Sequence, residues 1–316
     1  MNILVTGGAG FIGSRYIKHV YENTAHNIIC VDKLTYAADR RRIPSHILNG
    51  GNRFVFIKED ICNLQSKSLP EIHMIVNFAA ESHVDNSIAN GKPFVNANVL
   101  GVMNLLQIAR EQESFHKFVQ VSTDEVYGDM TEYRTGNDCA TEAFPLKPSS
   151  YYSATKVAAE HLVTAAHRTY GIPYLITRCC NNYGPSQHGE KFIPVVTNSI
   201  NAGKSIPVYG KGDQIREWIH TDTHVKIIHE LSALREEAET YNIGTGLALT
   251  NIDLIDLIAY SLDKTYEIEN VADRLGHDRK YSIDCSKLLK RLPHLATELT
   301  PNIKNLKSFL DNEPRN

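Results

Sequence analysis

The sequence has no long hydrophobic run, no dense basic tract and no paired-cysteine motif, and each absence excludes a class of protein. The apolar run at residues 3–5 is far too short for a signal segment or a membrane span, so we expect a cytosolic protein without membrane contact. The formal charge is −3, and the one basic cluster is Arg40, Arg41 and Arg42. Nucleic acid is therefore not expected as a partner.

The cysteines and histidines also lack the spacing of metal ligands. The six cysteines form no CxxC pair, and we expect reduced thiols. His220 and His224 stand at i and i+4, as two metal ligands would, but no third ligand motif lies near them. We expect no metal site.

The pattern that is present predicts an α/β protein built on a doubly wound parallel (Rossmann) sheet. Short β-branched runs alternate with segments of helical period, which is typical of βαβ units. Six strands are predicted at residues 3–6, 28–31, 54–57, 74–78, 118–122 and 174–177, with helices at 12–21, 95–111 and 153–169. Residues 1–180 are expected to form this domain, and 181–316 a smaller mixed α/β part with helices near 251–261 and 303–311 and some chain crossing between the two.

The opening VTGGAGFIG predicts a dinucleotide site. Its glycines at Gly7, Gly10 and Gly13 follow a strand and begin a helix, as a tight turn against a pyrophosphate requires. Asp32 follows Gly13 by 19 residues, where a carboxylate can accept both ribose hydroxyls. The same charge repels a 2′-phosphate, so NAD is favoured over NADP, although the arginine cluster at 40–42 could in principle bind that phosphate.

A second motif predicts oxidation of a hydroxyl group. Tyr152 and Lys156 stand at i and i+4 on one helical face, so the ammonium is expected to lower the pKa of the phenol and make it a base. Thr123, at the end of the fifth predicted strand, can share a substrate hydroxyl with Tyr152.

Asp124 and Glu125 follow that strand directly and indicate a further reaction. Oxidation by tyrosine, lysine and threonine with NAD needs no adjacent carboxyl pair, whereas elimination of water needs a base and an acid. An arbitrary acidic dipeptide is usually a solvated turn. Its place at the strand end favours a catalytic role here.

These motifs, together with others along nearly the whole chain, resemble the extended short-chain dehydrogenases/reductases, and within them the dTDP-glucose 4,6-dehydratases. The motifs that carry the resemblance are TGGAGFIG from Thr6, VDKLTYA from Val31, AAESHVD from Ala79, STDEVYG from Ser122, YSATK from Tyr152, NNYGP from Asn181, GKGDQIREW from Gly210 and RLGHDR from Arg274.

The resemblance implies a lyase that holds NAD and makes a 4-keto-6-deoxy sugar. It implies Thr123 and Tyr152 at the C4 hydroxyl, Asp124 as the acid toward C6, Glu125 as the base at C5, and Lys156 on the nicotinamide ribose. It places NAD against Gly7, Gly10, Phe11, Ile12, Gly13, Asp32, Lys33, Leu34, Thr35, Asp60, Ile61, Ala79, Ala80, Tyr152, Lys156 and Asn182. It places the nucleotide sugar against Glu81, Ser82, Thr123, Asn181, Lys191, Phe192, Pro207, Val208, Tyr209, Arg216, Asn251, Arg274 and His277, with the two arginines as diphosphate clamps.

Three departures from that pattern leave the substrate open. Asn86 and Ala97 stand where relatives often carry Arg and Thr, and the loop after Gly128 is short; together they are expected to reshape the hexose pocket. UDP-glucose and UDP-N-acetylglucosamine, the latter with possible C5 epimerisation, stay beside dTDP-glucose as alternatives. A 4-epimerase and a nucleotide-sensing protein without activity are the rival functions. The resemblance also implies a homodimer formed through the helices at 95–111 and 153–169.

Overall fold

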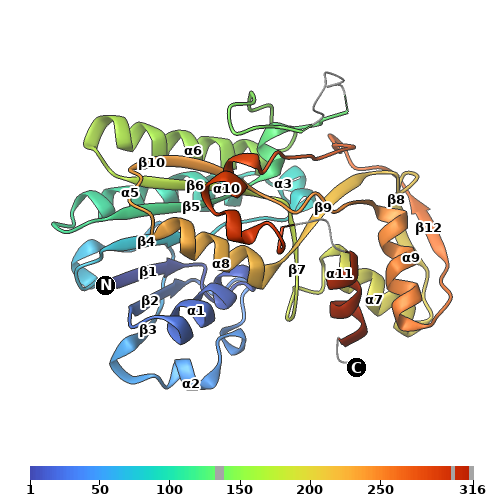
Figure 1. Cartoon of the computed structure of the whole chain (residues 1–316), viewed down its shortest axis with the longest axis horizontal. Helices are drawn as coiled ribbons and strands as arrows, with labels where there is room; N and C mark the ends of the chain where they lie inside the picture. The colour runs from blue at the N-terminus through green and yellow to red at the C-terminus, as the bar shows by residue number, and fades with distance from the viewer. Residues whose placement is uncertain (132–138, 300–302, 313–316) are drawn as a thin grey trace.

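A seven-stranded parallel sheet dominates the computed structural model, which describes residues 1–131, 139–299 and 303–312 (Figure 1). Its order is β10-β6-β5-β4-β1-β2-β3, and every neighbouring pair is parallel. The strands read as nearly continuous buried apolar runs because helices cover both faces. Their bounds are β1 Asn2–Thr6, β2 Asn27–Asp32, β3 Phe54–Lys58, β4 Met74–Asn77, β5 Lys117–Thr123, β6 Tyr174–Cys179 and β10 Ala238–Ile243.

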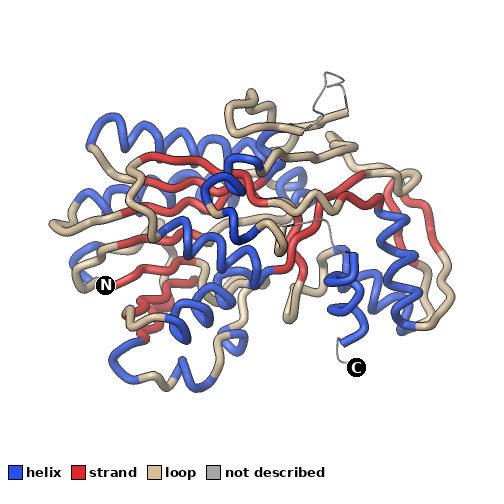
Figure 2. The backbone as a smooth tube through the Cα atoms, viewed as in Figure 1, coloured by secondary structure: helices blue, strands red, loops and turns tan. Residues whose placement is uncertain are grey.

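Two layers of helices enclose the sheet, each with its own apolar core. On one face, α1 (Phe11–Asn23), α8 (Thr221–Ser232) and α10 (Ser286–Arg291) bury residues such as Ile17, Ile228 and Leu288. On the other face, α5 (Gly101–Arg110) and α6 (Tyr151–Tyr170) bury Leu105 and Val163 among others. Figure 2 shows the strands as one layer between these helices. The predicted doubly wound α/β fold is confirmed.

The structure departs from the sequence prediction at two places. The sheet has seven strands rather than six, because β10, which follows residue 181 in the chain, pairs with β6. The helix expected at 95–111 is divided into α4 (Lys92–Val95), a π-helical segment η4 (Asn96–Leu100) and α5. Such a π-segment is frequent at functional sites.

The remaining strands and helices form a smaller unit beside the carboxyl edge of the sheet (Figure 1). β7 (Asn181–Tyr183), β9 (Ile215–His220) and β11 (Ala248–Thr250) make one small sheet, and β8 (Ile206–Tyr209) pairs with β12 (Ile268–Val271). Helices α7 (Phe192–Ala202), α9 (Asn251–Leu262) and α11 (Ile303–Asn312) share a third apolar core with them. Short connecting helices are η1 Arg40–Arg42, α2 Ser45–Leu48, η2 Gly51–Arg53, η3 Ser66–Ser68, α3 Val84–Ala89, η5 Asp124–Tyr127 and η6 Pro293–Leu295.

Within the described residues, every helix is too short or too polar to cross a lipid bilayer.

Candidate active site

A glycine turn between β1 and α1 brings backbone close to the end of β4. Gly7 has φ +66°, and a Cβ there would lie 2.6 Å from the amide nitrogen of Ala79. A Cβ on Gly13 would lie 2.3 Å from the carbonyl oxygen of Gly7, so only glycine allows α1 to start this near the strand. Gly10 caps α1 without a side-chain hydrogen bond, which leaves the first amides of the helix available for phosphate.

Asp32 ends β2 beside this turn. Its carboxylate accepts hydrogen bonds from the amides of Ala9, at 3.0 Å, and Leu34, at 2.8 Å. Burial raises the pKa of Asp32, and these two amides oppose the rise. The turn and the carboxylate thus fit an adenine dinucleotide with a free 2′-hydroxyl.

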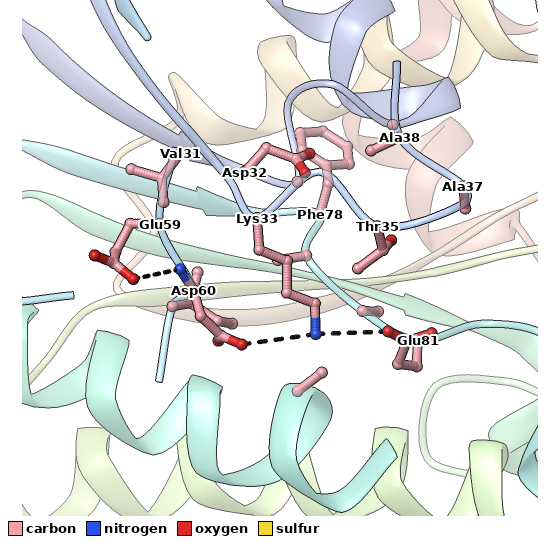
Figure 3. A pocket seen from close by; sticks show the side chains of 16 residues that line it. Val31, Asp32, Lys33, Thr35, Ala37, Ala38, Glu59, Asp60, Phe78 and Glu81 are labelled. Atoms are coloured by element: carbon pink, nitrogen blue, oxygen red, sulfur yellow. Dashed lines mark hydrogen bonds and ion pairs between the residues drawn. The ribbon is translucent and has the colours of Figure 1, made fainter. Parts of the chain in front are cut away.

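Nine of the sixteen predicted cofactor residues line one pocket at this edge of the sheet (Figure 3). We call it the cofactor pocket. Phe11, Ile12, Gly13, Leu34, Tyr152, Lys156 and Asn182, also predicted, are not among its lining residues. The lining consists of Gly7, Gly10, Val31, Asp32, Lys33, Thr35, Ala37, Ala38, Glu59, Asp60, Ile61, Phe78, Ala79, Ala80, Glu81 and Ala97.

Glu81 belongs to this lining, although the resemblance had placed it with the sugar. Figure 3 shows the ammonium of Lys33 between two carboxylates, 3.5 Å from Glu81 and 3.7 Å from Asp60. Asn98 holds the backbone of Glu81 from η4, accepting from its amide at 2.9 Å and donating to its carbonyl at 3.0 Å. Asn98 also donates to the hydroxyl of Thr155 at 2.9 Å, so it links the pocket to α6.

The three arginines of the cluster have partners within the chain. Arg42 donates to the carbonyls of Ala9 and Ala37, and Arg41 pairs with Asp39 at 2.8 Å. The guanidinium of Arg40 lies 4.8 Å from the ring centroid of Phe56.

The predicted catalytic residues meet where β5 ends and α6 begins. Thr123 caps η5, and its hydroxyl donates to the carboxylate of Asp124 at 3.2 Å. Tyr152, in the first turn of α6, takes the side chain of Thr123 as a hydrogen-bond partner. Lys156, one turn later, donates to the carbonyl of Val121 at 2.6 Å. Thr123, Asp124, Tyr152 and Lys156 are all buried.

The two neighbouring carboxyls have different electrostatic surroundings. Burial raises the pKa of Asp124 well above its usual range, and the charges of Glu125 and Glu217 raise it further. Burial also raises the pKa of Glu125, but Arg216 and Lys191 oppose that rise. Asp124 is therefore suited to hold a proton and Glu125 to accept one.

The prediction that Lys156 lowers the pKa of Tyr152 is wrong for the protein without a bound cofactor. Burial raises the pKa of Tyr152 well above its usual range, and the charge of Glu125 adds to the rise. Burial also lowers the pKa of Lys156 to about 8, and its ammonium binds the strand carbonyl. Spacing along α6 brought both side chains to the site, but burial is the largest cause of the pKa shift of each.

The two arginines expected as diphosphate clamps differ in their contacts. The guanidinium of Arg216 is buried, donates to the carbonyls of Ile215, Asp278 and Arg279, and lies 4.2 Å from the ring centroid of Tyr281. Its hydrogen bonds to backbone are not those of a free phosphate donor. Arg274 binds Asp85 through one edge of its guanidinium.

Other residues expected at the sugar occupy the smaller unit. Val208 is buried in its apolar core, so its side chain is not available to a ligand. Lys191 caps α7, and Phe192 begins it and packs partly against the core. Asn251 begins α9 and donates to Gln214 at 3.2 Å. Pro207 and Tyr209 take part in β8–β12 pairing, and Asn181 in β7–β9 pairing. The hydroxyl of Tyr209 also donates to Asp85, and Nδ1 of His277 lies 2.7 Å from Asp273. Ser82 follows Glu81 in the loop before α3.

Two of the residues that depart from the family pattern have defined surroundings. Ala97 lines the cofactor pocket. Asn86 donates to the hydroxyl of Tyr36 at 3.2 Å, on the loop after β2. Part of the short loop after Gly128, residues 132–138, falls outside the described residues.

Two polar residues of the site were missed from the sequence. Asn98 lies within a predicted amphipathic helix, and Glu217 lies in β9 between Arg216 and Trp218. Both are buried, which is unusual for these residue types unless they have hydrogen-bond partners. The sequence feature that could have identified such residues is a polar side chain at a position that the pattern predicts to be buried. His224 is also buried, and its Nδ1 lies 2.8 Å from the side-chain oxygen of Asn182.

Comparison with known proteins gives consistent results. The model of the NAD dependent epimerase/dehydratase family matches residues 3–244. The chain is 40% identical to dTDP-glucose 4,6-dehydratase 1 of Escherichia coli, over 92% of this chain and 87% of that protein. It superposes on the dTDP-glucose 4,6-dehydratase DesIV of Streptomyces venezuelae, solved with NAD, with a TM-score of 0.88, 39% identity and full coverage of both chains. UDP-glucuronic acid 4-epimerase of Bacillus cereus is 26% identical with a TM-score of 0.88, covering 99% of this chain and 98% of that one.

Proposed function

The chain belongs to the NAD dependent epimerase/dehydratase family, and from that premise we propose that it converts a nucleotide-diphosphate hexose, with dTDP-glucose as the first candidate, into its 4-keto-6-deoxy form. The observation that carries the proposal is the carboxyl pair beside Tyr152, in which Asp124 is buried and Glu125 is half-buried. An epimerase or a simple dehydrogenase has no use for both acids.

Each residue has a separate task in this reaction. When bound, NAD supplies a hydride acceptor for C4, a hydride donor for C6 and a positive charge near the phenol. Tyr152 and Thr123 hold the C4 hydroxyl, and Tyr152 takes its proton. Glu125 removes the proton at C5, which the C4 ketone makes acidic. Protonated Asp124 gives its proton to the C6 hydroxyl, which leaves as water and leaves a double bond between C5 and C6. Glu125 then returns a proton to C5 as C6 is reduced to a methyl group.

The assay that tests this proposal offers the protein dTDP-glucose, UDP-glucose and UDP-N-acetylglucosamine in separate reactions. Mass spectrometry and proton NMR resolve the products. We expect dTDP-glucose to lose one water and gain a C6 methyl group, and the NMR spectrum to report the configuration at C5. The purified protein should turn over without added nicotinamide, because a cofactor regenerated in each cycle need not leave.

Two sets of variants separate dehydration from its rivals. Tyr152→Phe should abolish turnover in any of the enzymes considered. Asp124→Asn together with Glu125→Gln should abolish water loss. If that double variant dehydrates at the parent rate, the assignment is wrong, and a parent that binds the sugar without any turnover would favour the sensing role.

We also propose a homodimer in a reducing, cytosolic compartment. Three apolar side chains are exposed along α4, η4 and α5: Val95 at 45%, Leu100 at 45% and Met103 at 53%. Residues 154 and 165 of the neighbouring α6 are exposed alanines, which allow close approach of another helix. All six cysteines are free, as in a reducing compartment.

A further inference from the structure

One carboxylate joins the two units of the molecule across the proposed sugar site. Asp85 lies on α3, which follows β4 of the large sheet. Its Oδ1 lies 2.5 Å from Nε of Arg274, and its Oδ2 accepts hydrogen bonds from Nη2 of Arg274 at 3.0 Å and from the hydroxyl of Tyr209 at 3.2 Å. Arg274 and Tyr209 both belong to the smaller unit, in the loop after β12 and at the end of β8.

These contacts leave one edge of the guanidinium available. Asp85 occupies the Nε and Nη2 edge, and the ring of Tyr209 lies on one face with its centroid 5.1 Å away. Nη1 of Arg274 makes no hydrogen bond within the described residues, and 21% of the side chain is exposed. A guanidinium with a fixed edge and a free nitrogen is suited to bind a phosphate oxygen.

Arg274 is one of three cations that act on Glu125. Burial raises the pKa of Glu125, whereas Arg216, Lys191 and Arg274 oppose the rise, so all three cations act on the catalytic carboxyl. An anionic group of the substrate would be attracted to the same place.

We propose that Asp85 is a positioning residue, which orients Arg274 so that its free edge binds the substrate diphosphate. The inference rests on the proposed function, because it takes the diphosphate of a nucleotide sugar as the ligand. Without Asp85, a flexible arginine would lose conformational entropy when the substrate binds. Because Asp85 orders the guanidinium before binding, part of this entropic cost does not fall on the binding step. Asp85 itself touches neither the sugar nor the reacting atoms.

A double-mutant cycle on the full-length protein with its bound NAD tests this role. Calorimetry would measure the binding of dTDP and of UDP to the parent, Asp85→Asn, Arg274→Ala and the double variant. We expect Asp85→Asn to weaken binding about tenfold, with a rise in KM for dTDP-glucose that exceeds any fall in kcat. In the Arg274→Ala background, Asp85→Asn should have no further effect, because Asp85 acts through that guanidinium.

Asp222→Asn is the matched control, since Asp222 makes a similar ion pair with Arg15 on α1, and neither residue is among those expected at the sugar. It should leave binding unchanged. If Asp85→Asn binds either diphosphate as tightly as the parent or more tightly, Asp85 competes with the ligand and the proposal fails. If Asp85→Asn weakens diphosphate binding by the same factor in the parent and in the Arg274→Ala background, Asp85 only stabilises the contact between the two units. The proposal also fails in that case.

The cycle separates this inference from the proposed reaction. A protein that binds dTDP with the expected coupling but dehydrates no sugar would overturn the reaction and leave the role of Asp85 intact. A parent that binds neither dTDP nor UDP would overturn the nucleotide-sugar site and the clamp with it.

Discussion

At the scale of single residues, the site depends on two adjacent acids that have unequal surroundings. Asp124 is enclosed and lies near Glu217, whereas Glu125 faces Arg216 and Lys191. The acidic dipeptide was predicted to be catalytic from its place at a strand end. The order of the two pKa values depends on β9 and α7, which the local sequence does not reveal.

Asp124→Asn should stabilise the protein while it abolishes dehydration. The pKa of Asp124 is raised in the folded state, so its contribution to stability is fully present below the unfolded pKa of about 3.9 and is lost as the pH rises through the folded pKa. The neutral amide avoids that loss. Denaturant unfolding from pH 4 to 8 should show the stability of Asp124→Asn relative to the parent increasing with pH. A difference that shrinks with pH would contradict the assigned direction of the shift.

At the scale of elements, a buried polar network connects the catalytic end of β5 to its neighbours. Arg178 on β6 pairs with Glu160 on α6 at 2.7 Å and donates to the hydroxyl of Tyr127 in η5 at 2.8 Å. Tyr127 donates in turn to Asn242 on β10 at 2.7 Å. Four elements are thus held together behind the active site.

Arg178→Ala should destabilise the fold by about 3–5 kcal/mol, because it leaves the Glu160 carboxylate buried without its partner. Arg291→Ala is the control, since its ion pair with Glu236 is more exposed and should contribute at most about 1 kcal/mol. Chemical denaturation measures both. Equal losses for the two variants would mean that burial does not control the strength of the network.

The glycine turn before α1 gives a second prediction at this scale. Gly13→Ala should destabilise the protein by about 1–3 kcal/mol and release NAD, because the new Cβ would lie 2.3 Å from the Gly7 carbonyl and push α1 from the strand. Gly189→Ala should change neither quantity noticeably, since its Cβ meets no atom within 4 Å. Thermal unfolding and the absorbance of bound cofactor after purification report the two effects. Retention of NAD by Gly13→Ala would show that the close approach is dispensable.

At the scale of the whole molecule, the exposed apolar residues of α4, η4 and α5 predict how two copies associate. Met103→Glu should place a charge in the proposed dimer interface and give a monomeric protein, measured by light scattering during size-exclusion chromatography. Val55→Glu changes an apolar residue of similar exposure on the edge strand β3 and should leave the dimer intact. A parent that is already monomeric would contradict the interface.

The local sequence was enough to predict the parallel sheet, the glycine turn with Asp32, and the residues at the ends of β5 and α6, because strand and helix periodicity and motif spacing are properties of neighbouring residues. It could not supply the seventh strand, the pKa of Tyr152, or the contacts of Arg216, Glu217 and Asp85. Those depend on burial and on charges from segments that lie from 27 residues away along the chain, for Glu125 beside Tyr152, to 189 residues away, for Arg274 beside Asp85, and only the tertiary structure brings such segments within reach of each other.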